Sequence, residues 1–448
     1  MISPLNLAMI KKYNCFVSAL KDKFFLFSPH SLATAIIDNP NGFTESDFLL
    51  ALSEQQVKEL FENDVFIYDK RDAYSMGKYY SDKLKYKKSL VISDTMTFSC
   101  NMDCVYCFEN RTKKIVSNQS IGKRMGEIVK LIDLYLSDIE HLDYVFFGGE
   151  PLLDVNYILS IADFLTKRYP MIRIDFSLTS NGTLINDKFI ELCKKYNFKE
   201  IRITIDGPAQ VHNLRRIMKN HVNSYNIILE NIKKLCENTN ITVIINTVLD
   251  DNNAKYYFEM VADLIEKFEK YIFGDTPQIV FNVGMLCHPV FDTSYTENKE
   301  TANSSGSSLY YTICERLIEM GATITSPYYS AHCMNSAEKD FTIAPNGGIY
   351  KCVTGVGSER FLLSSYDDFI SDPVLLIRKN ICQIEQSHGA ACWQCDYLTM
   401  CNGVCKCQHY EKGDILCRKK VFENEMESFM RLLFLGTFTE KRFFKKRE

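Results

Sequence analysis

The sequence CNMDCVYC places three cysteines, Cys100, Cys104 and Cys107, in one short loop after an apolar, strand-like run. Three thiolates in such a loop can bind three irons of a [4Fe–4S] cluster, for which four cysteines are the complete set. The missing fourth ligand leaves one iron open to a substrate or cofactor, as in catalytic metal centres generally. The alternative is a zinc site, but zinc prefers paired CxxC arms and a fourth ligand, and no further Cys or His is near. The spacing therefore favours a catalytic iron–sulfur cluster.

A second group of seven cysteines lies in the last part of the chain. Its members are Cys333, Cys352, Cys392, Cys395, Cys401, Cys405 and Cys417. A secreted disulfide scaffold would be short and dense in cysteine throughout, so clustered cysteines in this long chain indicate metal ligands. For this segment taken alone, structural zinc knuckles are the alternative.

The remaining composition is that of an ordinary globular protein. The 448 residues are 46% apolar and 24% charged, and 52 Lys and Arg against 56 Asp and Glu give a net charge of −4. This balance excludes a disordered chain and argues against wholesale nucleic-acid or membrane binding. No run of 18 apolar residues predicts a transmembrane helix, and the N-terminus lacks the charged-then-apolar order of a signal peptide. We therefore expect a cytoplasmic protein.

Strand-like runs alternate with amphipathic helical patterns through residues 86–290. The six predicted strands are Leu90–Thr95, Tyr144–Phe147, Ile172–Leu178, Ile201–Ile205, Ile241–Val248 and Ile279–Val283. The helices are expected near 119–136, 154–168, 187–196, 223–236 and 254–268. This alternation predicts an α/β fold with a parallel sheet, and six strands are too few for a closed eight-stranded barrel. We expect a partial (β/α)6 barrel, with the first cysteine group at the strand ends where barrels carry active sites.

Two further regions flank this barrel, which we assign to residues 86–300. Residues 1–85 read as a small β-then-α, winged-helix-like domain, with strands at Cys15–Leu20 and Phe24–Phe27 and helices at Ser31–Ile37, from Thr44, and at Glu54–Phe61. We assign residues 301–330 to a bridging loop and helix. The polar run 292–308, which begins in the preceding region, predicts a loop, and 309–320 a helix. Residues 331–448 form a cysteine-rich domain that ends in a helix.

The first cysteine group resembles the cluster motif of the radical S-adenosylmethionine (SAM) superfamily. The resemblance extends to GGEP, TSNG and DGP motifs after the next three predicted strands, in order, followed by His212 and Arg216. Each motif is weak alone, because such sequences are usually turns. Together they imply SAM contacts from Tyr106, Gly148, Gly149, Glu150, Pro151, Ser180, Asn181, Asp206 and Arg216.

The resemblance also implies a role for several of these groups. The GGEP backbone would meet the SAM amino group and Ser180 the ribose. Arg216 would bind the carboxylate, since a guanidinium can pair with both oxygens, although the adjacent Arg215 is an alternative. Cys100, Cys104 and Cys107 would hold the catalytic cluster, whose reduction cleaves SAM to a 5′-deoxyadenosyl radical that removes a hydrogen from an unactivated carbon.

The second group resembles the seven-cysteine SPASM domain of radical SAM enzymes that modify peptides and proteins. By position, Cys392, Cys395, Cys401 and Cys417 would bind a distal auxiliary [4Fe–4S] cluster. A proximal auxiliary cluster would be held by Cys333, Cys352 and Cys405, which makes three clusters in all. Its remaining iron would be open to a substrate thiolate, or bound by another residue such as His332, Cys382 or Cys407.

Two classes of radical SAM enzyme share this layout. One matures ribosomally made precursor peptides, and the other oxidises a Cys or Ser of sulfatases to formylglycine. In the second class the first cysteine group lies near the N-terminus, whereas about 99 residues precede it here. This extension favours a peptide maturase whose N-terminal domain binds a leader by strand addition, although it could be a packing appendage without a ligand.

We therefore expect a thioether crosslink made from a substrate Cys, with an auxiliary cluster accepting the surplus electron. The alternatives are a carbon–carbon crosslink, formylglycine formation, or a non-enzymatic iron–sulfur electron carrier. The expected partners are a precursor peptide with its leader and an electron donor such as flavodoxin or ferredoxin, with no nucleic acid and no membrane.

Overall fold

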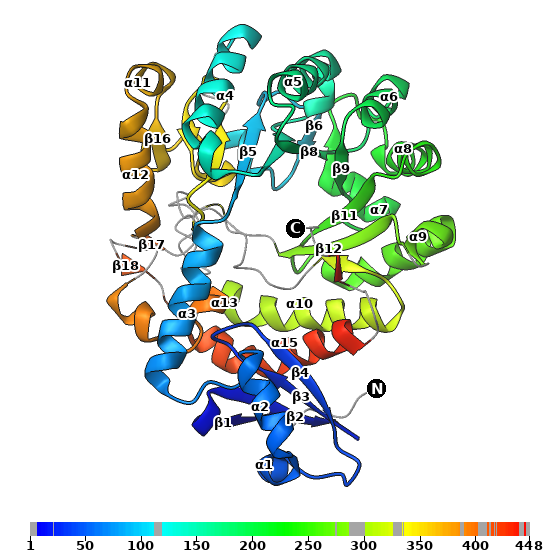
Figure 1. Ribbon diagram of the computed structural model, residues 1–448. Helices are drawn as coiled ribbons and strands as arrows, with labels where there is room; N and C mark the ends of the chain where they lie inside the picture. The colour runs from blue at the N-terminus through cyan, green and yellow to red at the C-terminus, as the bar shows by residue number, and fades with distance from the viewer. Residues whose placement is uncertain are drawn as a thin grey trace.

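The computed structural model has a curved parallel sheet at its centre and a small antiparallel sheet at one end (Figure 1). The structure describes residues 7–20, 22–111, 119–273, 276–285, 301–325, 334, 336–385, 389–401, 410–411, 414–415, 417, 419–438 and 443–444.

Six parallel strands, in the order β5-β7-β8-β9-β11-β12, form the partial barrel that the sequence predicts. Their bounds are β5 (Ser89–Thr95), β7 (His141–Phe147), β8 (Arg173–Ser180), β9 (Phe198–Thr204), β11 (Thr242–Leu249) and β12 (Ile279–Met285). The helices cover the convex face of the sheet and are α4 (Ile121–Tyr135), α5 (Val155–Arg168), α6 (Asp187–Lys195), α8 (Ser224–Asn238) and α9 (Tyr257–Ile272) (Figure 1). Every second strand residue, such as Tyr144 and Phe146 in β7, is buried in the core that includes these helices.

The sheet continues beyond the barrel at both edges, to eleven strands among the described residues. Next to β5 runs the parallel strand β14 (Asp340–Ile343), followed by the antiparallel strands β15 (Ile349–Tyr350) and β16 (Leu362–Ser364). Next to β12 run β13 (Ile324–Thr325) and β19 (Phe443–Phe444). The C-terminal region is therefore continuous with the barrel sheet, because its strand β14 pairs with the first barrel strand.

Helix α10 (Thr301–Glu319) lies between the barrel and the N-terminal sheet (Figure 1). The loop predicted for 292–308 is wrong for residues 301–308, which form the first turns of this helix, while 292–300 lie outside the described residues. The following half of α10 buries Tyr310, Ile313 and Leu317, and the helix packs against the C-terminal helix. Packing of this kind stabilises a helix whose first turns are polar, because most helical stability in proteins comes from a buried face.

The N-terminal domain has the predicted β-then-α order, with four antiparallel strands in the order β1-β2-β3-β4. Its elements are β1 (Leu7–Ile10), β2 (Cys15–Leu20), β3 (Lys23–Phe27), β4 (Thr34–Asp38), α1 (Phe48–Ala51), α2 (Glu54–Glu62) and α3 (Lys70–Lys85). The helix predicted at Ser31–Ile37 is wrong, because this segment enters β4. Its β-branched residues Thr34, Ile36 and Ile37 suit a strand, and pairing with β3 along its whole length decides the conformation.

Both faces of this N-terminal sheet are covered. On one face, Phe25 packs against Phe434 and Phe27 against Phe429 of helix α15 (Lys419–Phe438), with ring centroids 5.6 and 5.4 Å apart. The opposite face packs with α1 and α2. The N-terminal domain is thus built onto the C-terminal helix of the chain.

The rest of the cysteine-rich region consists of short elements. They are α11 (Tyr366–Ser371), α12 (Pro373–Glu385), the 3-10 helix η10 (Ala390–Gln394), α13 (Leu398–Cys401), β17 (Tyr410–Glu411) and β18 (Asp414–Ile415). None of the described helices combines the length and the apolar character that crossing a membrane requires.

Candidate active site

The loop that carries Cys100, Cys104 and Cys107 follows β5 at the C-terminal end of the barrel. Its strand β6 (Met102–Cys104) pairs with β10 (Arg216–Met218), and this register sets Cys104 opposite Arg216. The Cys107 N–H donates to the carbonyl of Cys104 at 3.1 Å, which closes a turn around the last two cysteines. All three cysteines are partly exposed and free of disulfides.

The three thiols form one electrostatically coupled group. Burial raises the pKa of Cys100 to about 11, and the Glu150 carboxylate and the other two cysteines add to that rise. The Met102 N–H and the Asn181 amide point at Cys100 Sγ, at 3.4 and 3.8 Å, as donors to a ligand sulfur do in iron–sulfur proteins.

These sulfurs suit a cluster better than a single ion. Among the described residues, the three atoms are not all within 4.8 Å of one another. Thiolates that share one zinc ion at about 2.3 Å would have to be closer than that. The arrangement therefore fits a multi-iron cluster and argues against the zinc alternative.

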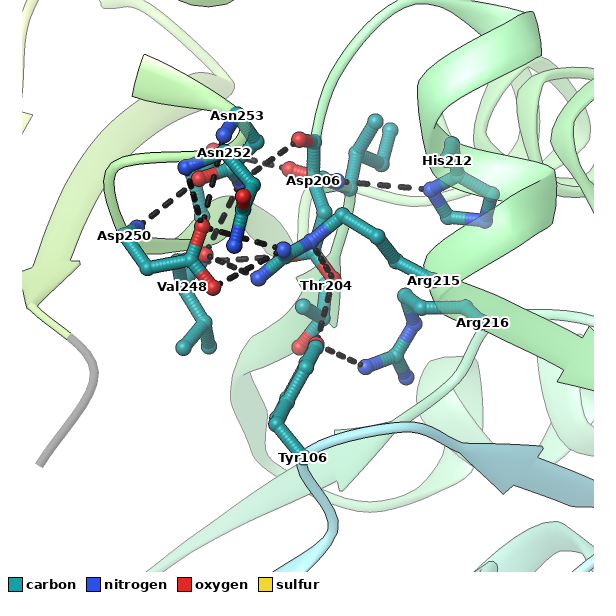
Figure 2. Close-up of polar contacts among 12 residues, drawn as sticks. Tyr106, Thr204, Asp206, His212, Arg215, Arg216, Val248, Asp250, Asn252 and Asn253 are labelled. Atoms are coloured by element: carbon teal, nitrogen blue, oxygen red, sulfur yellow. Dashed lines mark hydrogen bonds and ion pairs between the residues drawn. The ribbon is translucent and has the colours of Figure 1, made fainter. Parts of the chain in front are cut away.

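Tyr106 belongs to a network of polar side chains that includes Asp206, Arg215 and Arg216 (Figure 2). Its hydroxyl donates to the Asp206 carboxylate and accepts a hydrogen bond of 2.7 Å from Arg216 Nη1. Asp206 is fully buried and also accepts from the Val248 N–H at 3.0 Å. Burial raises the pKa of Asp206, and the nearby Arg216 opposes that rise. Asp206 thus orients Tyr106 directly and Arg216 through the Tyr106 hydroxyl, and it is itself shielded from solvent.

The two adjacent arginines have different surroundings. Arg215 pairs with the Asp250 carboxylate at 2.9 Å, and its guanidinium lies 5.2 Å from the centre of the Tyr106 ring (Figure 2). Arg216 has no carboxylate at ion-pair distance in the part of the chain that the structure describes, and its backbone pairs with Cys104. Arg216 is therefore better placed than Arg215 to receive a carboxylate beside the cluster.

The predicted His212 serves the fold of this region. It is fully buried, its Nδ1 accepts from the Asp206 N–H at 3.3 Å, and its Nε2 lies 3.1 Å from the Ser224 hydroxyl. Burial lowers the pKa of His212 to about 3, so the ring stays neutral.

The GGEP turn lies directly against the cluster loop. The Gly149 N–H donates to the Thr97 carbonyl at 2.8 Å, and the Glu150 N–H to the Ser99 carbonyl at 2.9 Å. A Cβ on Gly149 would lie 2.2 Å from the Ser99 oxygen, and one on Gly148 would lie 2.4 Å from the Thr97 oxygen. Only glycine fits at both positions, and Gly148 also has a φ of 136°. An ammonium group only donates hydrogen bonds, so one bound here would use the carbonyl oxygens of the turn.

The Glu150 carboxylate is fully buried behind this turn, before the 3-10 helix η5 (Pro151–Asp154). It accepts from the Ser180 hydroxyl at 2.8 Å and from the Asn181 N–H at 2.7 Å, while Ser180 Oγ accepts from the Gly182 N–H. The Ser180 hydroxyl, predicted to contact a ribose, therefore links the TSNG motif to the GGEP motif, because it donates its hydrogen bond to Glu150.

Two residues that sequence reasoning missed complete the link between TSNG and the cluster loop. Asn101 accepts from the Asn181 amide at 2.7 Å and donates to the Thr183 hydroxyl at 2.9 Å. Lys219 donates to the Cys100 carbonyl at 2.7 Å. Asn101 directly follows Cys100 and Lys219 lies shortly after Arg216, and these positions are the signal in the sequence that could have identified both residues.

A further missed residue is Glu109, two positions after Cys107. It is buried, and burial together with the Glu150 carboxylate raises its pKa to about 8.

The second cysteine group is described in part. Cys392, Cys395 and Cys417 influence one another electrostatically, and the Cys395 N–H donates to the Cys392 carbonyl at 3.1 Å. Cys401 ends helix α13 nearby. Cys352 and Phe98 pack against the same small apolar cluster, and Phe98 lies two residues before Cys100. Cys382 is exposed on α12, and four predicted or alternative ligands lie outside the described residues, namely His332, Cys333, Cys405 and Cys407.

Residues 95–278 match the Radical SAM superfamily. The uncharacterized protein MJ0907 of Methanocaldococcus jannaschii is 32% identical over 172 residues, which are 38% of this chain and 56% of that protein. A cysteine-type anaerobic sulfatase-maturating enzyme of Clostridium novyi is 22% identical over 69% of this chain and 85% of its own length. The radical SAM cyclopropyl synthase TigE of Paramaledivibacter caminithermalis is 25% identical over 70% of this chain and 66% of its own length.

Solved structures show the same fold. The structure of anSMEcpe with bound AdoMet and the Cp18Cys peptide superposes with a TM-score of 0.60 at 19% identity, covering 79% of this chain and all of that one. Residues 95–278 are thus a radical SAM domain, and the chain is an enzyme.

Proposed function

We propose that this enzyme modifies a peptide or protein after translation, using SAM and three [4Fe–4S] clusters. The observation that carries the proposal is the SPASM-type cysteine pattern that follows a radical SAM domain in the same chain. Support comes from Cys352, which packs against the same small apolar cluster as Phe98 of the first cysteine loop. The similarity to a sulfatase-maturating enzyme over 69% of this chain points the same way.

Each group of the candidate site has a task in this proposal. Cys100, Cys104 and Cys107 hold the first cluster and leave one iron for SAM. Arg216 pairs with the SAM carboxylate, and Tyr106 and Asp206 keep its guanidinium in place. The GGEP carbonyls accept from the SAM amino group, while Ser180 and Asn181 fix that turn through Glu150. When bound and reduced, the cluster and SAM supply a 5′-deoxyadenosyl radical that takes a hydrogen atom from an unactivated carbon.

The proposed product is an intramolecular thioether in a Cys-containing precursor peptide. A C–H and an S–H bond break and a C–S bond forms, so the product is two hydrogens lighter, and an auxiliary cluster takes the remaining electron. The proximal auxiliary cluster has three assigned thiolates, and an open iron would bind the substrate sulfur and favour its thiolate. The N-terminal domain would bind the leader, and a flavodoxin or ferredoxin would supply electrons.

Formylglycine formation in a sulfatase is the second candidate. It is favoured by the similarity to the Clostridium novyi enzyme, which covers 85% of that protein. Against it stands the N-terminal domain of residues 7–85, because a substrate that enters as a short loop needs no leader-binding module.

The test uses the holoenzyme reconstituted without oxygen and reduced with dithionite. It is incubated with SAM and either the short peptide encoded beside its gene or a sulfatase-derived peptide. A thioether maturase releases 5′-deoxyadenosine and yields a peptide two hydrogens lighter with one fewer alkylatable Cys. If all Cys still alkylate in a product that is two hydrogens lighter, the crosslink is between carbons. Conversion of only the sulfatase peptide would establish the second candidate, and absence of 5′-deoxyadenosine would refute both.

A further inference from the structure

The concave face of the barrel sheet is not filled by a hydrophobic core. In β7, the residues that face the helices are buried, while the alternate residues Val145 and Phe147 remain partly accessible. The same alternation recurs at Thr179 in β8, Arg202 in β9 and Asn246 in β11. In closed eight-stranded barrels, by contrast, inward side chains pack into layers that fill the interior. The accessible concave face is therefore suited to receive a substrate.

The N-terminal end of this face carries a cluster of charged side chains. The Asp175 carboxylate contacts His141 Nε2 at 3.1 Å and Arg173 Nη2 at 2.8 Å, and Lys199 lies at 3.8 Å. His141, Asp143 and Asp175 have the proximity of metal ligands, but Asp175 is already engaged by cationic side chains. This group is therefore not proposed as a metal site.

A row of amide and hydroxyl groups crosses the same concave face. The Asn246 amide donates to the Thr204 hydroxyl at 3.3 Å, and the Asn282 amide donates to Asn246 Oδ1 at 2.7 Å. The Thr325 hydroxyl donates to Asn282 Oδ1 at 2.7 Å. The four side chains come from the neighbouring strands β9, β11, β12 and β13, so they form a continuous polar row.

Arg202 lies one step below Thr204 on the same face of β9, in register with Thr179 and Ile244. No ion pair or hydrogen bond holds its guanidinium among the residues that the structure describes, and Glu200 influences it only at longer range. Burial of this cation lowers its pKa, which is the signature of a charge that lacks a close anion. A guanidinium in such a place favours a carboxylate, with which it can form two parallel hydrogen bonds.

The SAM carboxylate is not the natural partner of Arg202. Four residues of strand, about 13 Å at roughly 3.3 Å per residue, separate it from Asp206 at the cluster end. Arg216 lies at that end, opposite Cys104. No described residue supplies a close anion to Arg202, and a second molecule that enters the barrel could supply one.

We propose that Arg202 is a substrate-binding residue that receives a carboxylate of the peptide, with the row from Thr204 to Thr325 binding polar groups next to it. This rests on the proposed function and narrows its substrate class to peptides with an Asp, a Glu or a C-terminal carboxylate near the modified residue.

The test is an affinity selection from a displayed library of random peptides, some with a free C-terminus, against the SAM-bound holoenzyme. The wild type, Arg202→Gln and Arg202→Glu are compared, with Arg173→Gln as the matched control because it also removes a barrel guanidinium. The wild type and the control should enrich acidic peptides about tenfold or more over their amide counterparts, as expected for a charge-assisted pair. Arg202→Gln should lose this preference and Arg202→Glu should favour Lys and Arg.

Reductive SAM cleavage is measured in parallel and should keep its KM for SAM in all Arg202 variants. Retention of the acidic preference by Arg202→Gln would overturn the proposal, and so would a tenfold rise of the KM for SAM in that variant. Failure of every enzyme to retain any peptide would instead refute the peptide substrate of the proposed function.

Discussion

The side-chain hydroxyl of Thr399 donates a hydrogen bond of 2.6 Å to the carbonyl oxygen of His30, a residue 369 positions earlier in the chain. It also lies 3.2 Å from the carbonyl of Gly77. Thr399 belongs to the segment between Cys395 and Cys401, two proposed ligands of the distal cluster. The N-terminal domain is thereby fastened to the part of the chain that would carry this cluster.

Replacing Thr399 with Val should weaken this attachment, because it leaves the His30 carbonyl without its hydroxyl donor. We expect a loss of about 1–3 kcal/mol in stability, the usual cost of an unsatisfied buried polar group. Anaerobic thermal unfolding and limited proteolysis near residue 86 measure the effect. Thr166→Val, at an exposed position of α5, is the control and should change stability by less than about 0.5 kcal/mol. Equal behaviour of the two variants would show that the contact contributes nothing.

Arg216→Gln and Arg215→Gln should separate the roles of the two arginines. Loss of Arg216 should raise the KM for SAM by about tenfold or more, because a charged hydrogen-bonded pair is lost. Loss of Arg215 should mainly lower the melting temperature, since its partner Asp250 is left unpaired. Reductive formation of 5′-deoxyadenosine at varied SAM concentration gives the KM for SAM of each variant. A larger rise of this KM in Arg215→Gln than in Arg216→Gln would show that Arg215 binds the SAM carboxylate.

Gly149→Ala should displace the cluster loop, because the new Cβ would lie 2.2 Å from the Ser99 carbonyl. The expected result is that both SAM cleavage and the absorbance of the first cluster are lost. Gly126→Ala is the matched control, since its Cβ meets nothing within 4 Å on helix α4. That variant should be as active as the wild type and more stable by about 0.5–1 kcal/mol. An active Gly149→Ala enzyme would show that the two loops can separate.

Glu127→Gln should stabilise the protein increasingly as the pH rises. Glu127 is buried beside Arg124 at 3.4 Å, and burial raises its pKa to about 8. Between the ordinary pKa of a glutamate and about 8, the folded state retains a proton that the unfolded state has lost. The contribution of Glu127 to stability therefore falls as the pH rises through this range. The difference in melting temperature between Gln and Glu should therefore grow from pH 6 to pH 8 and level off above. A difference that does not vary with pH would mean that Glu127 is ionised throughout.

Replacing Cys100, Cys104 and Cys107 together with Ala should remove one cluster and leave two. Three four-iron clusters correspond to about 12 irons per chain, so the variant should retain about eight. SAM cleavage should be abolished while the absorbance of the auxiliary clusters remains. Loss of all the iron would show that the three sites do not assemble independently.

The sequence predicted the barrel well because its strands bury alternate or continuous apolar residues, such as those of β7 and β9. The helix prediction at Ser31–Ile37 was wrong because pairing with β3 favours a strand there. The loop prediction was wrong at residues 301–308 because their polar composition does not indicate a helix, which is stabilised by the packing of the later turns of α10. Arg202 was missed for a related reason. A charged residue between Ile201 and Ile203 looks solvent-exposed until the curvature of the sheet turns that face inward.

The pairing of β5 with β14, and of the N-terminal sheet with α15, also sets an order of events during synthesis. A growing chain makes its first barrel strand and its aromatic N-terminal sheet long before the ribosome has translated the segments that cover them. Until then one edge of the sheet and one row of phenylalanines are open to other proteins, and chaperones bind such surfaces. The barrel sheet and the N-terminal sheet therefore reach their final packing only after the C-terminal segments have been translated.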